Sequence, residues 1–258
     1  MMAKIHPTAI IENGAKLAGD VEIGAYAYIG AEVEIGSGTV VAHHATVDGF
    51  TKMGENNEIF PYAFVGGKTH DLKFKGGRPG LIIGSGNVFR EYCTVHLATA
   101  DNTFTQIGSF NNFLAYSHVA HDCVVADHII MSAHSALGGH VKVGNYAVVS
   151  WGSGVHQFCR IGEYAMLSAA SKAVKDIPPF MMADGSPAEV CAINKVNMQR
   201  HDFTERDINE VFFAFKTIYK KGLNRKHAFL EISQRPDSEN GVLGRILKFA
   251  ESATERSV

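Results

Sequence analysis

Aliphatic residues recur every sixth position along most of this chain. The residue four places after each aliphatic is usually small, so large and small side chains alternate. A period of six with two inward positions predicts a solenoid whose triangular coils each contain three short strands. The aliphatic positions are Ile5, Ile11, Leu17, Ile23, Ile29, Ile35, Val41, Val47, Met53, Ile59 and Val65, and then Ile107, Phe113, Val119, Val125, Met131, Leu137, Val143, Val149, Val155, Ile161 and Leu167.

Glycine often follows the aliphatic residue directly, as at Gly24 and Gly144. Because glycine tolerates unusual backbone angles, we predict that these glycines form the tight corners of the coil. Cys93, Cys123 and Cys159 share the small position of the repeat. We expect them to be buried fillers, since they form neither CxxC pairs nor a disulfide framework.

Two segments interrupt the repeat, residues 67–81 and residues 97–105, and the pattern resumes after each. Both are expected to leave the solenoid as loops. A surface loop is often a tolerated insertion, but loops on a rigid scaffold are also where sites are built. The sequence leaves these two interpretations open.

The repeat fades near Asp176, and a helical pattern follows. Thr204 and Asp207 are spaced as a capping box, apolar residues then recur at helical spacing, and Gly222 is a stop signal. Further helices are expected over 226–233 and 242–250. The fold class predicted is a left-handed parallel β-helix of hexapeptide repeats over residues 1–190, with a small C-terminal α-helical domain over 191–258.

Composition and charge argue against nucleic-acid binding and against attachment to a membrane. Of the 258 residues 46% are hydrophobic and 19% charged, and the formal net charge is −2. No overall field therefore draws the protein to nucleic acid or to an anionic membrane. We find neither a secretory signal pattern nor an apolar run of about 18 residues. We therefore expect a cytoplasmic protein without an integral membrane segment.

Six of the 13 histidines lie in the uninterrupted second run of the repeat. Residues three hexads apart stack in successive coils, so Gly139 is predicted beside His121 with His140 next to it. His128 and His134 are expected to be solvated surface residues. The group predicted to converge on one edge of the prism is His118, His121, Gly138, Gly139, His140 and His156.

Two chemistries fit this edge. A neutral histidine can take a proton from an attacking hydroxyl while the Gly139 amide holds the oxyanion. Three histidines can instead hold zinc, as in the γ-class carbonic anhydrases, which use the same solenoid. The sequence neighbours His121 and Asp122 leave a strand on different sides unless a corner intervenes. Asp71, Lys73 and Arg200 favour a larger, charged substrate over hydration of a small molecule.

Six motifs resemble the UDP-N-acetylglucosamine O-acyltransferases, which begin lipid A synthesis, over essentially the whole chain. They are IHPTAIIENGA at 5–15, HDLKF at 70–74, HVAHDC at 118–123, GGHV at 138–141, VHQFCRIG at 155–162 and KDIPPF at 175–180. The resemblance implies a homotrimer with sites between subunits. It also implies transfer of a 3-hydroxyacyl chain from acyl carrier protein to the 3-position of UDP-N-acetylglucosamine, without a cofactor or metal.

The resemblance assigns roles to individual residues. His121 matches the general base, Asp122 its orienting partner, and Gly139 the amide that binds the oxyanion. Ala169 falls where the family sets acyl-chain length, and its methyl group predicts a slightly shorter chain than glycine would. Contacts to the sugar, nucleotide or acyl donor are implied for Asp71, Lys73, His96, His118, His140, His156, Gln157, Asn194 and Arg200.

The chain departs from the family at His70, Leu97, Ala98 and His201. These positions lie in the segments expected to contact the sugar nucleotide. An acceptor with a 3-amino group, which would give an amide, therefore stays open beside the 3-hydroxyl sugar. A metal-dependent hydratase and a module that only binds acyl carrier protein are the other two hypotheses.

Overall fold

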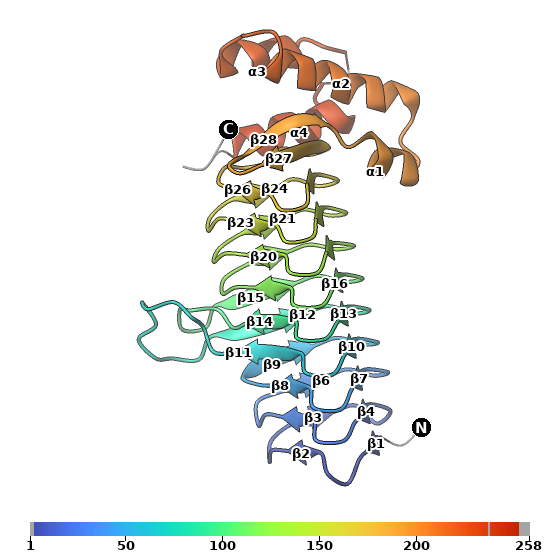
Figure 1. Cartoon of the computed structure of the whole chain (residues 1–258), viewed down its shortest axis with the longest axis vertical. Helices are drawn as coiled ribbons and strands as arrows, with labels where there is room; N and C mark the ends of the chain where they lie inside the picture. Colours follow the sequence, from blue (N-terminus) through green and yellow to red (C-terminus); the bar gives the residue numbers. More distant parts are fainter. Residues whose placement is uncertain (1–2, 237, 253–258) are drawn as a thin grey trace.

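A computed structural model describes residues 3–236 and 238–252, which form a triangular prism of stacked coils with helices at one end (Figure 1). Most strands are only two residues long, and consecutive strands belong to different sheets except for the last two, which share one sheet. Three sheets, parallel apart from the antiparallel pairing of those last two strands, therefore form the three faces of the prism. This confirms the β-helix predicted from the six-residue period.

The first sheet has eleven strands, in the order β1 (Lys4–Ile5), β4 (Glu22–Ile23), β7 (Val40–Val41), β10 (Glu58–Ile59), β13 (Val88–Phe89), β16 (Asn112–Phe113), β19 (Ile130–Met131), β22 (Val148–Val149), β25 (Met166–Leu167), β27 (Met181–Gly185) and β28 (Ala188–Ile193). The second has nine, in the order β2 (Ile10–Ile11), β5 (Tyr28–Ile29), β8 (Thr46–Val47), β11 (Phe64–Gly67), β14 (Thr94–His96), β17 (His118–Val119), β20 (Ala136–Leu137), β23 (Gly154–Val155) and β26 (Lys172–Ala173). The third has eight, in the order β24 (Arg160–Ile161), β21 (Lys142–Val143), β18 (Val124–Val125), β15 (Phe104–Ile107), β12 (Gly80–Ile83), β9 (Phe50–Met53), β6 (Glu34–Ile35) and β3 (Lys16–Leu17).

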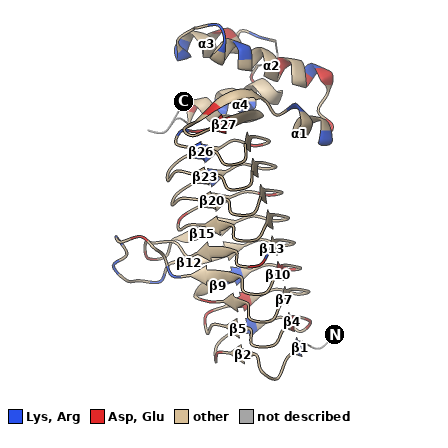
Figure 2. Ribbon diagram, in the orientation of Figure 1, with Lys and Arg blue, Asp and Glu red and all other residues tan. Residues whose placement is uncertain are grey.

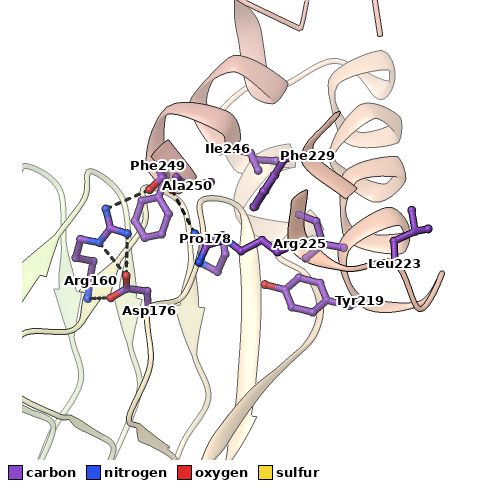
Figure 3. A pocket seen from close by; sticks show the side chains of 11 residues that line it. Arg160, Asp176, Pro178, Tyr219, Leu223, Arg225, Phe229, Ile246, Phe249 and Ala250 are labelled. Carbon is purple, nitrogen blue, oxygen red and sulfur yellow. Dashed lines mark hydrogen bonds and ion pairs between the residues drawn. The ribbon is translucent and has the colours of Figure 1, made fainter. Parts of the chain in front are cut away.

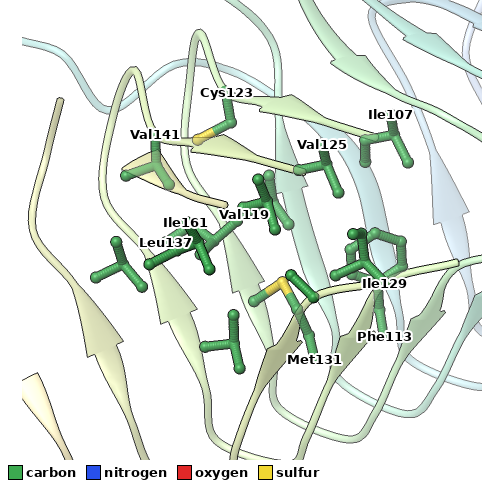
Figure 4. Packing of buried hydrophobic residues seen from close by; sticks show 14 of the residues in the cluster. Ile107, Phe113, Val119, Cys123, Val125, Ile129, Met131, Leu137, Val141 and Ile161 are labelled. Carbon is green, nitrogen blue, oxygen red and sulfur yellow. The ribbon is translucent and has the colours of Figure 1, made fainter. Parts of the chain in front are cut away.

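The core is a stack of aliphatic layers inside the prism (Figure 4). Residues such as Val119 and Leu137 are fully buried and face each other across neighbouring strands. Phe89 and Phe113 stack with ring centroids 4.9 Å apart. Cys93, Cys123 and Cys159 are buried, as predicted. One coil alone buries little, so stability comes from stacking each layer on the next.

The two insertions lengthen their coils without breaking the sheets. Stacked residues are 18 apart in an uninterrupted coil, as for Asn111 and Ile129. The separation rises to 30 across the first insertion, between Asn57 and Asn87, and to 24 across the second, between Asn87 and Asn111. The loops cover 68–79 and 97–103, slightly shorter than predicted because β11, β12 and β15 extend into the expected ranges.

The reason predicted for the repeated glycines is wrong. Gly24 and Gly144 do not have positive φ; the positive φ angles fall two places later, at Tyr26 and Tyr146. A Cβ on Gly144 would lie 2.6 Å from the backbone nitrogen of Glu163 in the next coil. Glycine is therefore required at this position by the close approach of successive coils.

Aromatic rings at the positive-φ positions stack into columns along the corners. Tyr146 lies between His128 and Tyr164, with ring centroids 4.6 and 4.8 Å away. His134 stacks on Tyr116 at 4.9 Å. His128 and His134 are exposed, as expected, but each also packs against an aromatic neighbour in the adjacent coil.

Within the described residues, a β-hairpin and four helices close the C-terminal end of the prism. β27 pairs with β25 and then with β28. The helices are α1 (Lys195–Arg200), α2 (Glu205–Tyr219), α3 (Arg225–Ser233) and α4 (Gly241–Glu251). Thr204 and Asp207 form the predicted capping box of α2. The expected domain boundary at residue 190 falls within β28, and the division into two domains stays a prediction.

A buried ion pair ties α4 to the prism (Figure 3). Arg160 bonds Asp176 through Nε at 2.9 Å and Nη2 at 2.8 Å, and its Nη1 donates to the carbonyl oxygens of Phe249 and Ser252. An apolar cavity of about 200 Å³ lies beside this pair. None of the described helices is long and apolar enough to cross a membrane.

Candidate active site

His121, His140 and His156 lie at the corner between the second and third sheets, which we call the histidine corner (turn residues 120–123, 138–141 and 156–159), and His118 lies just before it on β17. Strands β17, β20 and β23 stack in register, with Val119 opposite Leu137 and Leu137 opposite Val155. The His121 and His140 rings lie 5.4 Å apart. Both insertion loops also leave the prism at this corner, since each connects a second-sheet strand to a third-sheet strand.

His121 and Asp122 form a close pair. His121 Nδ1 lies 2.7 Å from Asp122 Oδ2, and each side chain is 13% exposed. Asp122 has a φ of 59°, a left-handed conformation that aspartate adopts more readily than most residues. A corner therefore does intervene between the two neighbours, and it turns both side chains to the same side.

The second insertion holds this pair in place through Thr99. The backbone N–H of Thr99 donates to Asp122 Oδ1 at 3.1 Å, and its hydroxyl lies 3.1 Å from His121 Nδ1. The same hydroxyl bonds Thr69 of the first insertion at 2.9 Å. Sequence reasoning missed Thr99, because a single threonine in a loop carries no periodic signal.

Asp122 is arranged to stay ionised. Burial by itself raises the pKa of Asp122, but hydrogen bonds from His121 and Thr99 outweigh it, and the net pKa is lowered from 3.8. A carboxylate fixed on Nδ1 holds the proton of a neutral imidazole on that nitrogen. The Nε2 nitrogen of His121 is then left with its lone pair and can accept a proton.

Gly139 faces the His121 ring, as the stacking predicted. A Cβ at this position would lie 2.5 Å from His121 Cε1 and 2.7 Å from Nε2. Within the part of the chain that the structure describes, the Gly139 N–H has no acceptor. The corner thus offers a proton acceptor and a free amide donor side by side.

His70, His96 and His118 form a second cluster next to the pair. The ring of His96 lies 3.9 Å from that of His70 and 5.1 Å from that of His118. Burial, together with His70, His118 and His121, lowers the pKa of His96 to about 4. Burial also lowers the pKa of His118, with His70 and His121 adding to the effect. Both rings are therefore neutral near pH 7.

The first insertion brings Asp71 to the same corner. One ligand atom from each of Asp71, His121 and His140 lies within 4.8 Å of the other two. Lys73 follows on the same loop, and its backbone N–H donates to Asp71 Oδ1 at 2.8 Å. His140 Nε2 is also 3.6 Å from Asp122 Oδ2. The set of two imidazoles and a carboxylate differs from the three-histidine set considered from the sequence.

An open groove of about 520 Å³ runs along the second sheet from this corner. His118, Gly138 and His156 line it at one part, and Ala170 and Lys172 line it at another. Gln157 is exposed beside it. Ala169, predicted to set chain length, is exposed and directly precedes Ala170.

Asn194 and Arg200 lie elsewhere on the prism. Asn194 caps α1, and its side-chain amide donates to the carbonyl of Tyr164 at 2.9 Å. Arg200 is exposed at the end of the same helix. Helix α1 packs on the corner between the third and first sheets, through a bond from Asn197 to Tyr146. One chain therefore does not bring Arg200 to the histidine corner.

The fold and the site together are those of an acyltransferase built on six-residue repeats. Residues 176–258 match the family described as Udp N-acetylglucosamine O-acyltransferase, Domain 2. An acyl-(acyl-carrier-protein)-UDP-N-acetylglucosamine O-acyltransferase from Stenotrophomonas maltophilia is 40% identical over 252 residues, 97% of this chain and 95% of the relative. The chain belongs to the UDP-N-acetylglucosamine O-acyltransferase family and is an O-acyltransferase.

Other relatives agree. The enzyme of the same name from Thiobacillus denitrificans is 44% identical over 222 residues, which is 86% of both chains. The solved structure of the UDP-N-acetylglucosamine O-acyltransferase from Moraxella catarrhalis is 35% identical and superposes with a TM-score of 0.94, covering 98% of this chain and 99% of that one. The similarity thus spans both the prism and the helices.

Proposed function

We propose that this enzyme transfers a 3-hydroxyacyl group from acyl carrier protein to the 3-hydroxyl of UDP-N-acetylglucosamine, the step that begins lipid A biosynthesis, in the cytoplasm. The observation that carries the proposal is the His121–Asp122 pair with the free Gly139 amide beside it. The curated relatives carry the name of this reaction. The groove beside the pair gives an acyl chain a surface to lie on.

The geometry supports a direct transfer. His121 Nε2 takes the proton of the sugar hydroxyl as its oxygen forms a bond to the thioester carbonyl carbon. The Gly139 N–H donates to the oxyanion of the tetrahedral intermediate. The carbon–sulfur bond then breaks, and the imidazolium returns its proton to the departing thiolate. Asp122 stabilises the imidazolium during this sequence.

The remaining predicted residues surround this centre or lie further along the chain. Asp71, His96 and His140 lie near the base and Lys73 follows Asp71 on the same loop, and all four are proposed to contact the sugar. His118, His156 and Gln157 are proposed to contact the sugar or the acyl donor along the groove. Ala169 is proposed to limit the length of the acyl chain. If Ala169→Gly leaves the preferred acyl length unchanged, this role is wrong.

We further propose a homotrimer whose active sites lie between subunits. His121 and Arg200 occupy different corners of the same prism, so one chain presents only part of the predicted site. A neighbouring copy packed corner to corner would supply the other part, and rotation about a closed three-fold axis would complete three such sites. Asn194 and Arg200 then bind the nucleotide, for which a guanidinium suits the diphosphate.

Mixing two inactive variants tests this arrangement. His121→Ala and Arg200→Ala are unfolded together, refolded as a mixture and assayed. Shared sites predict that about a quarter of the sites regain both side chains after random assembly. Light scattering measures the molecular mass of the wild-type assembly and so distinguishes a trimer from a monomer. A monomer, or a mixture with no more activity than its parents, contradicts the shared site.

Acyl carrier protein is the proposed donor partner. Figure 2 shows Lys and Arg on α1, α2 and α3. Lys216 and Lys220 lie over the rings of Phe212 and Phe215, at 4.4 and 5.5 Å from the ring centroids. The basic side chains on these helices would receive an acidic carrier protein by steered association. Charge reversal at Lys216 should then slow transfer at low salt more than at high salt, and an equal loss of rate at both salt concentrations would exclude this role for Lys216.

Product analysis with two acceptors, together with measurements of carbon dioxide hydration, bound metal and carrier-protein binding, separates the alternatives that the sequence left open. The enzyme is given 3-hydroxyacyl carrier protein with either UDP-N-acetylglucosamine or its 3-amino analogue, and product is measured by mass spectrometry. Faster ester formation supports the proposal, and faster amide formation assigns the amino acceptor. Carbon dioxide hydration with one tightly bound metal per subunit would favour the hydratase. Capture of the carrier protein without turnover would favour a binding module.

A further inference from the structure

The histidine corner has the geometry of a transition-metal site. Asp71 comes from the first insertion, and His121 and His140 come from successive coils, with one ligand atom of each within 4.8 Å of the others. All three residues are partly buried. Two imidazoles and a carboxylate, with one position open to water, are the donor set of many zinc sites.

Small movements would close this set around an ion. Zinc–ligand bonds of about 2.0–2.2 Å in a tetrahedron place the donor atoms about 3.3 Å apart. Asp71 lies on the loop over 68–79, where Leu72 is fully exposed and packs against nothing. The 4.8 Å limit exceeds this spacing by about 1.5 Å, so a movement of that size in the loop and a turn of the partly exposed His140 ring would close the set around an ion.

The surroundings of His121 already match those of a metal-bound histidine. Metal-ligating histidines usually donate their other ring N–H to a carboxylate, which fixes the ring and its tautomer. His121 Nδ1 does this with Asp122 Oδ2 at 2.7 Å. Gly139 leaves the Nε2 edge uncovered, since a Cβ there would lie 2.7 Å from that nitrogen. The arrangement that frees Nε2 for a proton frees it equally for a metal ion.

We propose that Asp71, His121 and His140 form a reversible inhibitory site for zinc and similar divalent cations. A metal on His121 Nε2 occupies the lone pair that would accept the sugar proton, so bound zinc stops transfer. The metal also engages Asp71, which places it in competition with the sugar nucleotide. The binding stands on the geometry alone, whereas its inhibitory consequence rests on the acyltransferase reaction proposed above.

Cobalt titration of the untagged full-length protein tests the binding directly. The wild type should take up one Co²⁺ per subunit with the intense visible absorption of a tetrahedral ion, and ZnCl₂ should abolish that signal. His140→Gln and Asp71→Asn should each weaken binding at least about 10-fold. His128→Gln is the matched control, because His128 also has positive φ and stacks on an aromatic ring but lies at another corner. No saturable cobalt signal, or equal loss in the control, overturns the site.

An activity measurement tests the inhibitory role. Zinc should lower the rate of acyl transfer with an inhibition constant equal to its dissociation constant, and EDTA should restore the rate. Raising UDP-N-acetylglucosamine should raise the zinc concentration needed. Saturable zinc binding with undiminished transfer overturns the inhibitory role. If the protein transfers no acyl group at all, the proposed function fails while the cobalt titration still decides the metal site.

Discussion

Asp122 determines how the candidate base is held. Its left-handed φ of 59° turns the carboxylate toward His121, and Thr99 fixes it from the loop above. Position in the repeat predicted that His121 and Gly139 meet. It did not predict the pairing with Asp122, because a positive φ at a non-glycine residue cannot be read from spacing.

Replacing Asp122 by asparagine tests the dyad. Asp122→Asn keeps the size of the side chain but removes the charge that holds the Nδ1 proton and stabilises the imidazolium. We expect kcat to fall by about 10²-fold or more, with little change in KM. Steady-state kinetics gives the split, and circular dichroism confirms the fold. A variant that keeps wild-type kcat would remove Asp122 from the mechanism.

The neutral histidines beside the base predict a pH dependence of stability. The unfolded chain binds a proton at His96 near pH 6.5, whereas the folded chain binds it only near pH 4. As the pH falls through this window, the unfolded state gains a proton that the folded state lacks, so the free energy of unfolding decreases. The lowered pKa of His118 acts in the same direction.

His96→Gln should reduce this pH dependence. Urea unfolding of the wild type and the variant is compared at pH 7 and pH 5. The variant should lose less stability between the two values, whatever its stability at pH 7. Equal losses in both proteins would mean that His96 is not held neutral by the fold.

Elements were more predictable than the residues between them. The hexads, the stacking of three coils and the positions of α2, α3 and α4 follow from periodicity and capping residues, whereas the short helix α1 was not predicted. The number of residues that each loop adds to its coil does not follow from periodicity, because a loop needs only to leave the coil and return to it at the same corner. The stacking could therefore be followed from Ile107 onward, but not back to Asp71, which lies before the second loop.

Gly139 joins the scaffold to the site, since its lack of a side chain leaves room for the His121 ring from the neighbouring coil. Gly139→Ala should press on the His121 ring, because the new Cβ would lie 2.5 Å from Cε1. A displacement of about 1 Å costs roughly 100-fold in rate, and we expect a loss of this size in kcat/KM. The assay is paired with thermal unfolding. An unchanged rate in a folded variant would show that ring position is not critical.

At the scale of the whole molecule, the prism carries His121 and the C-terminal helices carry Arg200, which is proposed to bind the nucleotide. Arg160 makes a buried contact between the prism and the helices, since it bonds Asp176 and the end of α4. This contact was not predicted, because Arg160 occupies an outward strand position that is usually exposed. The helices bury it only after the chain has folded back on the last coil.

Arg160→Ala should destabilise the protein by about 3–5 kcal/mol, because it removes the guanidinium that bonds buried Asp176. Arg245→Ala is the matched control, since its 3.4 Å pair with Glu163 is partly exposed, at 44% and 26%, and is worth about 1 kcal/mol or less. Urea unfolding measures both free energies. Equal effects of the two substitutions would refute the role given to the buried pair.

The central claim is that His121 is the base of an acyl transfer to UDP-N-acetylglucosamine. The measurement that tests it most directly is the rate of 3-hydroxyacyl transfer from acyl carrier protein by the wild type, His121→Ala and the control His134→Ala. We predict that His121→Ala loses about 10²–10⁴-fold in kcat with its fold intact, while His134→Ala keeps the wild-type rate. Wild-type turnover by His121→Ala, or no transfer by the wild type, would contradict this account.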